Sequence, residues 1–174
     1  MAMTISGDGS ITGLAVGGLP DNVVDKDTLA VGVQSKVLQV VQGTYSTQAS
    51  NTTTTLADSG LTATITPSST SSKILVVVSQ ALGVSRIDPY HQANLALLRG
   101  ATTLQTIYKR INYTTSSNNM FSETQSINYL DSPSSISALT YKTQFKCNHG
   151  TNTEIAYVNY NGSGATITLM EIGV

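Results

Sequence analysis

The sequence predicts an all-β protein: an antiparallel β-sandwich, jelly-roll-like, preceded by a short N-terminal arm that is extended and partly helical. Two observations carry this prediction. About eight or nine short runs rich in apolar, β-branched and aromatic residues are separated by turn residues at the spacing typical of sandwiches and barrels. An alternating helix pattern, which a parallel α/β fold would need, is missing. The length of 174 residues fits one domain and an appendage.

Residues 1–36 are the predicted arm. Glycines spread between single apolar residues in its first half support neither a helix face nor a strand alternation. Residues 21–33 are the one predicted helical piece. Alone, the arm would bury too little apolar surface to stay ordered, so it packs either on its own domain or on another chain. The second alternative is favoured, with five apolar anchoring residues: Ile5, Ile11, Leu14, Val16 and Leu19.

The predicted sandwich covers residues 37–174, and its first strands are expected at 37–42, 61–66 and 72–79. The third is a continuous apolar run whose β-branched residues and short length favour a buried central strand. Two more strands, at 93–98 and 102–108, are expected on either side of a turn at Arg99 and Gly100. The polar segment 112–119 is expected to be an exposed loop.

The strand expected at 140–147 alternates in character. One face would carry Lys142, Gln144 and Lys146, and the other Tyr141, Thr143, Phe145 and Cys147. The last two strands, 154–160 and 165–172, are expected to pair as a hairpin across the glycine-rich loop 161–164.

The composition bounds the partners and the compartment. Charged residues are 11% of the chain, against roughly 25% in an average domain, and the net charge of -1 predicts no nucleic-acid or anionic-membrane partner. Low charge favours association between copies. The single cysteine excludes an intramolecular disulfide and indicates folding in a reducing cytoplasm. The sequence shows neither a membrane-spanning run nor a signal peptide.

The sequence predicts no catalytic site and no cofactor. A glycoside hydrolase needs two convergent carboxylates, about 5–9 Å apart. The acidic residues are scattered, and Asp58 and Asp131 are expected at turns. Motifs for a nucleophile elbow or a phosphate-binding loop are missing, and nothing brings His91 and His149 together.

No metal site is predicted either. Cys147 and His149 stand two residues apart at a strand end, but Cys147 is expected to be a small buried residue rather than a ligand. Asp21, Asp25 and Asp27 lack the calcium-loop pattern and suit a helix start.

One candidate binding surface remains. Tyrosine combines an apolar face with a polar tip, and three tyrosines stand among cationic residues near the polar loop. The candidate receptor-contact residues are Arg86, Tyr90, Tyr108, Arg110 and Tyr113. The alternative interpretation is a solvated loop whose tyrosines pack against the sandwich or a neighbouring subunit.

Several segments carry a resemblance to a known group of proteins. In the arm these are SGDGSITGL (6–14), GGLPD (17–21) and VDKDTLA (24–30), and in the sandwich SSKILV (71–76), LDSP (130–133) and ATITLMEIG (165–173). They resemble segments of fibre-like and knob-like virion structural proteins of marine and cyanobacterial tailed phages. The resemblance implies a role on the particle surface, commonly as a trimeric globular head, and carries no functional residues.

Two placements on the particle follow as expectations. One is a capsid-decorating knob or short head fibre held by the arm, and the other is a tail-fibre tip or adaptor that binds a host receptor. The arm is short and has no heptad or other repeat with which to build a shaft, which favours the capsid. The expected partners are further copies forming a homotrimer, the major capsid protein or a fibre or tail adaptor, and a host-surface glycan or protein. The protein would be assembled in the host cytoplasm and displayed on the virion.

Overall fold

The structure is a computed structural model that describes residues 4–5, 11–12, 36–86, 90–113, 119–149 and 154–173. The chain divides into two compact units, Met1–Ser35 and Lys36–Val174. In the first unit, the two-residue strands β1 (Thr4–Ile5) and β2 (Ile11–Thr12) pair antiparallel, with Ile5 opposite Ile11. The predicted helix at 21–33 and the predicted anchoring residues Leu14, Val16 and Leu19 lie outside the described residues.

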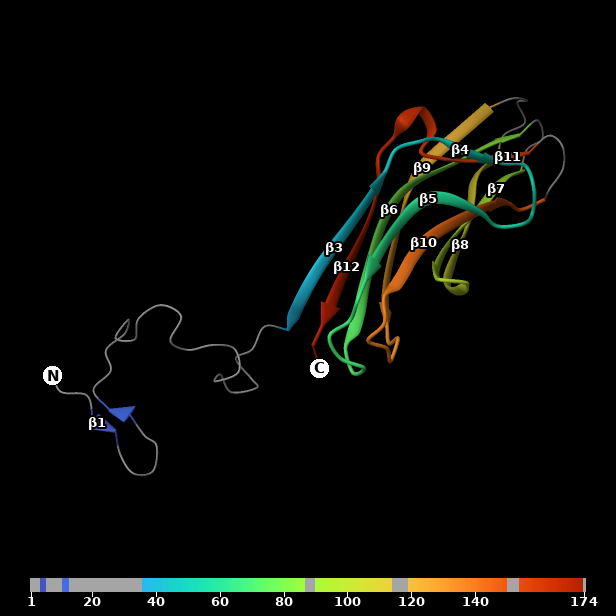
Figure 1. Ribbon diagram of the computed structural model, residues 1–174. Helices are drawn as coiled ribbons and strands as arrows, with labels where there is room; N and C mark the ends of the chain where they lie inside the picture. Colours follow the sequence, from blue (N-terminus) through green and yellow to red (C-terminus); the bar gives the residue numbers. More distant parts are fainter. Residues whose placement is uncertain are drawn as a thin grey trace. The chain divides into compact units, whose positions relative to one another are not determined.

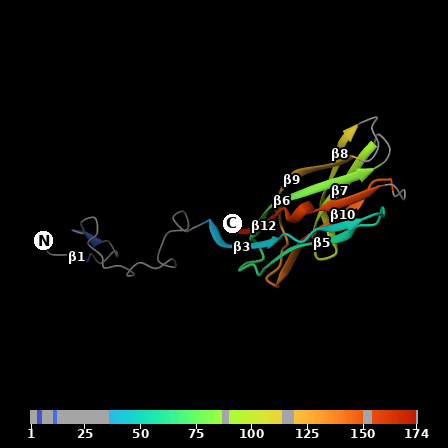
Figure 2. The same ribbon diagram turned by 90° about the horizontal axis from the view of Figure 1, so that it is seen from above.

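The second unit is a sandwich of two antiparallel sheets, which confirms the predicted fold class (Figures 1 and 2). The first sheet contains, in order, β5 (Ala57–Ile65), β10 (Leu139–Cys147), β7 (Tyr90–Arg99) and β8 (Thr102–Tyr113). The second contains β3 (Val37–Tyr45), β12 (Ala165–Ile172), β6 (Lys73–Arg86) and β9 (Asn119–Asp131). Two short strands, β4 (Ala49–Asn51) and β11 (Ile155–Val158), extend the second sheet alongside β6.

The eight long strands are connected as a jelly roll. The first pairs with the last, the second with the seventh, the third with the sixth and the fourth with the fifth, namely β3–β12, β5–β10, β6–β9 and β7–β8. The chain thus forms one long antiparallel hairpin wrapped into two sheets. As a result both ends of the unit meet, and the Gly173 amide donates to the Lys36 carbonyl at 2.8 Å.

The prediction that the last two strands pair with each other as a hairpin is wrong. Strands β11 and β12 both pair with β6, on the same side and end to end: Val158 lies opposite Leu82, and Thr166 opposite Ser79. The residues between them form an excursion with a short 3-10 turn, Tyr160–Gly162, after which the chain continues in its former direction. The glycine-rich loop therefore interrupts a single strand instead of reversing it.

The core fills the space between the sheets, and the period-2 pattern confirms the predicted faces of β10. Tyr141, Thr143, Phe145 and Cys147 are fully buried, whereas the residues between them are half-buried. The largest fully buried apolar side chains are Tyr141, Phe145, Leu61, Ile65, Ile74, Leu82, Leu95, Leu97, Ile127, Ile167 and Leu169. Each such burial stabilises the fold by about 1.5–3 kcal/mol.

Several strands are longer than the sequence predicts, and β9 was not predicted at all. The expected loop 112–119 begins within β8 and ends within β9. Asp58 lies inside β5 and Asp131 ends β9, so the turn positions expected for both are wrong. Strand β9 is an edge strand in which Ser122, Thr124, Ser126 and Asn128 face outward and only alternate positions face the core, which is why its apolar signal is weak.

A β-bulge interrupts the pairing of β5 with β10. Thr62 lies opposite Lys142 and Asp58 opposite Gln144, so three residues of β5 face the single residue Thr143. At the centre of the bulge, Gly60 has φ +87°, and a Cβ there would stand 2.2 Å from the Tyr45 ring. The bulge therefore depends on a glycine.

Replacing Gly60 with alanine should destabilise the protein by about 3 kcal/mol or more, because it adds both backbone strain and a steric overlap. Gly100→Ala is the matched control: Gly100 also has positive φ, at +57°, but a Cβ there meets nothing within 4 Å. The control should cost only about 1 kcal/mol. Urea unfolding of both variants measures the difference, and equal costs would contradict the packing argument.

Candidate functional site

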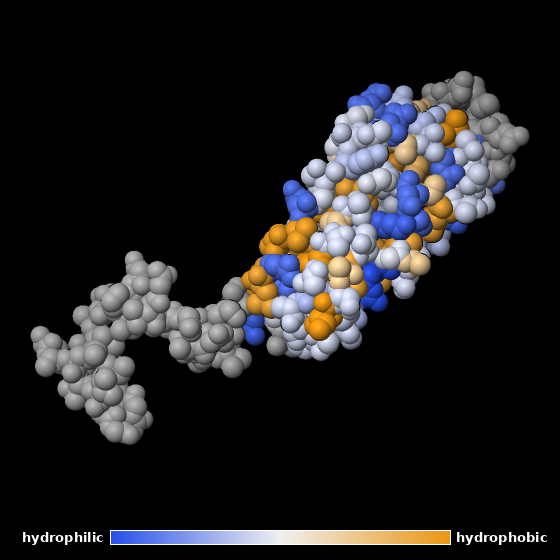
Figure 3. Space-filling model, in the orientation of Figure 1, coloured by the Kyte–Doolittle hydropathy of each residue, from blue (hydrophilic) through white to orange (hydrophobic). Residues whose placement is uncertain are grey.

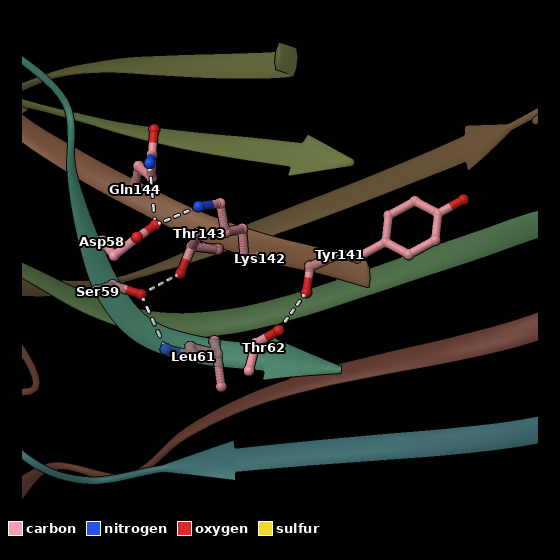
Figure 4. Close-up of polar contacts among 8 residues, drawn as sticks. All are labelled: Asp58, Ser59, Leu61, Thr62, Tyr141, Lys142, Thr143 and Gln144. Carbon is pink, nitrogen blue, oxygen red and sulfur yellow. Dashed lines mark hydrogen bonds and ion pairs between the residues drawn. The ribbon is translucent and has the colours of Figure 1, made fainter. Parts of the chain in front are cut away.

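The residues at the β5 bulge line a small hollow, and Figure 4 shows the polar contacts among them. The hollow has a volume of about 230 Å³ and is lined by Asp58, Gly60, Leu61, Thr62, Lys142 and Thr143. At its rim, the Asp58 carboxylate accepts from Lys142 Nζ at 2.7 Å and from Gln144 Nε2 at 2.9 Å. These two donors, Lys142 first, lower the pKa of Asp58, so the carboxylate is ionised and already paired.

At the base of the hollow, a chain of hydrogen bonds leads inward. The Leu61 amide donates to Ser59 Oγ at 3.1 Å, and Thr143 Oγ1 donates to Gln80 Oε1 at 2.7 Å. The two hydroxyls of Ser59 and Thr143 are 2.5 Å apart. Because each hydroxyl has one hydrogen and that of Thr143 goes to Gln80, Ser59 must donate to Thr143.

The chain continues to the far side of the core. Gln80 Nε2 donates to Asn159 Oδ1 at 3.2 Å, and Asn159 Nδ2 donates to the Thr47 carbonyl at 3.3 Å. Every donor therefore points the same way, from the bulge in β5 to the break between β3 and β4. We call these groups the donor chain. Ser59, Gln80, Thr143 and Asn159 are all buried, and the hydroxyl hydrogens of Ser59 and Thr143 go to neighbours rather than to a substrate.

Sequence reasoning placed Thr143 on the inward face but did not identify the donor chain. The sequence does carry a signal that Gln80 is buried. Alternate residues of β6 face the core, and Gln80 falls in the same alternating series as the buried apolar residues Ile74, Val76, Val78, Leu82 and Val84. A polar residue at such a position needs a buried partner.

A second polar cluster joins the two sheets near the Lys36 end. Asp131 Oδ2 accepts from Arg99 Nη1 at 2.6 Å and from the Tyr141 hydroxyl at 2.6 Å. Burial, together with the hydrogen bond to Asp131, raises the pKa of Tyr141 above its usual value. The cluster therefore holds β7, β9 and β10 together and leaves Tyr141 protonated.

Glu171 is another buried acid, and it fastens the loop between β5 and β6. Its Oε1 accepts from the Ser68 amide at 2.7 Å and the Ser68 hydroxyl at 2.6 Å, and its Oε2 accepts from Gln39 Nε2 at 2.6 Å. Burial alone would raise the pKa of Glu171, but these hydrogen bonds outweigh it and hold the pKa at about 2.

The candidate receptor-contact residues gather at the end of the sandwich away from Lys36, where β6 ends and β7 begins. Strand pairing places Tyr90 opposite Tyr113, and Arg110 opposite Gln92 on the same two strands. Arg86 ends β6. Tyr108 is 74% exposed and belongs to β8 as well. The positions of the other four side chains lie outside the described structure.

The same end holds Cys147, His149 and Glu154. The Cys147 thiol is buried and donates to the Asn51 carbonyl at 3.0 Å, whereas His149 is exposed and its amide donates to Glu154 Oε2 at 2.8 Å. Among the described residues, no three His, Cys, Asp or Glu side chains lie close enough to hold a metal ion. That part of the chain also has no helix of the length and apolarity needed to cross a membrane.

Comparisons with known proteins give similarity of fold only. No protein-family model and no curated protein matches the chain. It is similar to the insecticidal delta-endotoxin Cry8Ea1 from Bacillus thuringiensis, at 13% identity and TM-score 0.40, over 72% of this chain and 20% of that one. It is also similar to the VP2 subviral particle of infectious bursal disease virus, at 13% identity and TM-score 0.33, over 84% and 42%. The chain thus spans less than half of either structure, and this likeness assigns no family.

Thr143→Val should cost about 2–3 kcal/mol, because it keeps the shape of the side chain but leaves Ser59 and Gln80 buried without their partner. Thr140→Val is the matched control on the same strand. Thr140 is exposed, and its hydroxyl meets only that of Thr64 at 3.0 Å, so the change should stay within about 0.5 kcal/mol. Chemical denaturation measures both values, and a cost at Thr143 no larger than that at Thr140 would show the donor chain to be dispensable.

The Glu171 carboxylate should make the fold sensitive to acid. Its pKa falls from an ordinary 4.5 to about 2 on folding, so its contribution is complete above pH 4.5 and is lost as the pH falls toward 2. Glu171→Gln should lower stability by about 1–2 kcal/mol at pH 7 and flatten the loss between pH 4.5 and 2. Denaturant midpoints at pH 7 and 3 measure this. Asp58→Asn, at a side chain 61% exposed, is the control and should change the slope less.

Proposed function

We propose that this protein is a non-enzymatic structural protein displayed on the surface of a tailed-bacteriophage particle, as a capsid-decorating knob or short head fibre held by residues 1–36. The resemblance of its arm and strand segments to fibre-like virion proteins motivates the proposal. The expected partners are two further copies in a trimer and the major capsid protein, to which Ile5, Ile11, Leu14, Val16 and Leu19 would anchor the arm.

The observation that carries the proposal is that the jelly roll has two distinct ends. Strand β6 runs from Lys73, opposite Ile172, to Arg86, opposite Asn119. At about 3.3 Å per residue, its 14 residues span roughly 45 Å. The arm joins the domain at Lys36, which is bonded to Gly173 at the first end. Holding the arm would therefore leave the end with Arg86 and Tyr90 farthest from the attachment.

The interior chemistry supports a structural role. The donor chain uses the buried hydroxyls of Ser59 and Thr143 within the fold, and the one carboxylate of the hollow is paired with Lys142. Hydrolysis of a glycosidic bond needs two carboxyl groups working together across the bond. The bond from Thr143 to Gln80 ties the two sheets together, and the other two contacts tie β5 to β10 within one sheet.

Deleting residues 1–35 should leave the domain folded and remove it from particles. The truncated chain keeps Lys36, its bond to Gly173 and every strand pair of the sandwich. Its thermal midpoint should stay within about 5 °C of that of the full chain, since few stabilising groups are lost. Mass spectrometry of purified phage carrying the deletion should then find the protein missing. A truncation that fails to fold, or that still copurifies with particles, would contradict the role given to the arm.

The second candidate is a tail-fibre tip or adaptor that binds a host-surface glycan or protein. The exposed Tyr108 and the cross-strand pair of Tyr90 and Tyr113 at the far end favour it. Labelled antibodies against this protein separate the placements on whole virions: capsid label supports the first, and label confined to the tail, with blocking of infection by purified protein, supports the second. Degradation of a host polysaccharide by the purified protein would overturn both.

A further inference from the structure

The outer face of the second sheet changes from apolar to polar along its strands. Near Lys36, four cross-strand neighbours form what we call the apolar row: Val40, Met170, Leu75 and Leu130. They alternate with the core residues Leu169 and Val76, so they point away from the core. Four residues farther along the strands, the same face carries a second row, which we call the polar row: Thr44, Thr166, Ser79 and Ser126.

The apolar row is open to solvent. Val40 is 57% exposed and Leu130 is 52% exposed. Three further exposed apolar residues, Val37, Leu38 and Ile136, lie beside it at the same end. Figure 3 shows apolar surface gathered at the end of the second unit where β3 begins. An outward sheet face in contact with water alone is expected to be polar throughout, as the polar row is. The contrast between the two rows indicates that the apolar row is a contact surface.

We propose that a second copy of this chain packs on the apolar row. The row carries no ionisable side chain, and the outward row on the side away from Lys36, Gln42, Thr168, Val77 and Asn128, carries none either. On the other side the next outward residue of β6 is Lys73, which would lie at the rim of a contact centred on the row. A partner must therefore be apolar and uncharged where it meets the row, because an unpaired charge buried there would be costly. The row itself meets this requirement. In the proposed trimer, each copy would present its row toward the common axis, so that row meets row.

The width of the apolar row and the net charge of the chain agree with a second copy as the partner. Four strands at about 4.8 Å spacing make the apolar row roughly 15 Å wide, which suits the apolar centre of a modest interface. The Thr, Ser and Gln side chains of the neighbouring rows would form its polar rim. A net charge of -1 means that copies hardly repel one another. The inference does not depend on where the protein sits on a particle.

Sedimentation equilibrium of the full chain between 5 and 200 µM tests the proposal. The wild type should show a mass at least twice that of one chain, which is 18.3 kDa. The double variant Leu75→Gln, Leu130→Gln should weaken association by about 100-fold, since it replaces two paired members of the row. The matched control is Ser79→Gln, Ser126→Gln, which changes the paired residues of the polar row on the same two strands. It should change association by less than about fivefold.

Cross-linking gives a second measurement, which does not rely on the double variant folding. Cys147 is buried, so Leu75→Cys adds an accessible thiol that a short bismaleimide should join to its counterpart in another copy. Thr64→Cys, on the outer face of the other sheet, should not cross-link. A wild type that stays at 18.3 kDa throughout, or equal cross-linking at the two cysteines, would overturn the proposal. Association that the double variant leaves unchanged would overturn it as well.

Discussion

A line of buried polar groups, the donor chain, crosses the interior of the sandwich from Ser59 to the carbonyl of Thr47. This chain connects three irregular places in the strands: the bulge in β5, the break between β3 and β4, and the excursion between β11 and β12. Removing one partner would leave a buried group unsatisfied, at a cost of about 1–3 kcal/mol. The three irregularities are therefore fixed relative to one another, and the two sheets with them.

The rest of the architecture depends on this alignment. Asn159 takes the left-handed conformation, φ 54° and ψ 40°, which lets the chain leave β11 and return in line as β12. Strand β6 then has antiparallel partners on both sides near each of its ends, so its 14 residues stay extended from Lys73 to Arg86. The distance between the two ends of the jelly roll follows from that length.

Periodicity predicted what depends on local pattern: the sandwich, the buried run of β6 and the two faces of β10. It could not predict what depends on distant partners. Residues 161–164 read as a hairpin because glycine and asparagine permit a reversal, and only the pairing of both flanking strands with β6 shows otherwise. Asp58 and Asp131 read as turn residues because their cationic partners, Lys142 and Arg99, are distant in sequence. The binding role of the tyrosine-bearing end stays a prediction.

The apolar row lies at the end where the arm joins the domain, and this bears on how the two proposals would work together. Val37 and Leu38, next to the row, directly follow Lys36, so copies that associate through the row would hold their Lys36 residues near one another. In the proposed attachment, each arm alone would offer only a few apolar contacts to a particle. Joined arms would bind with a raised effective concentration, which can strengthen attachment by orders of magnitude without any new contact. Self-association at this end would thus let a short arm hold a domain of this size.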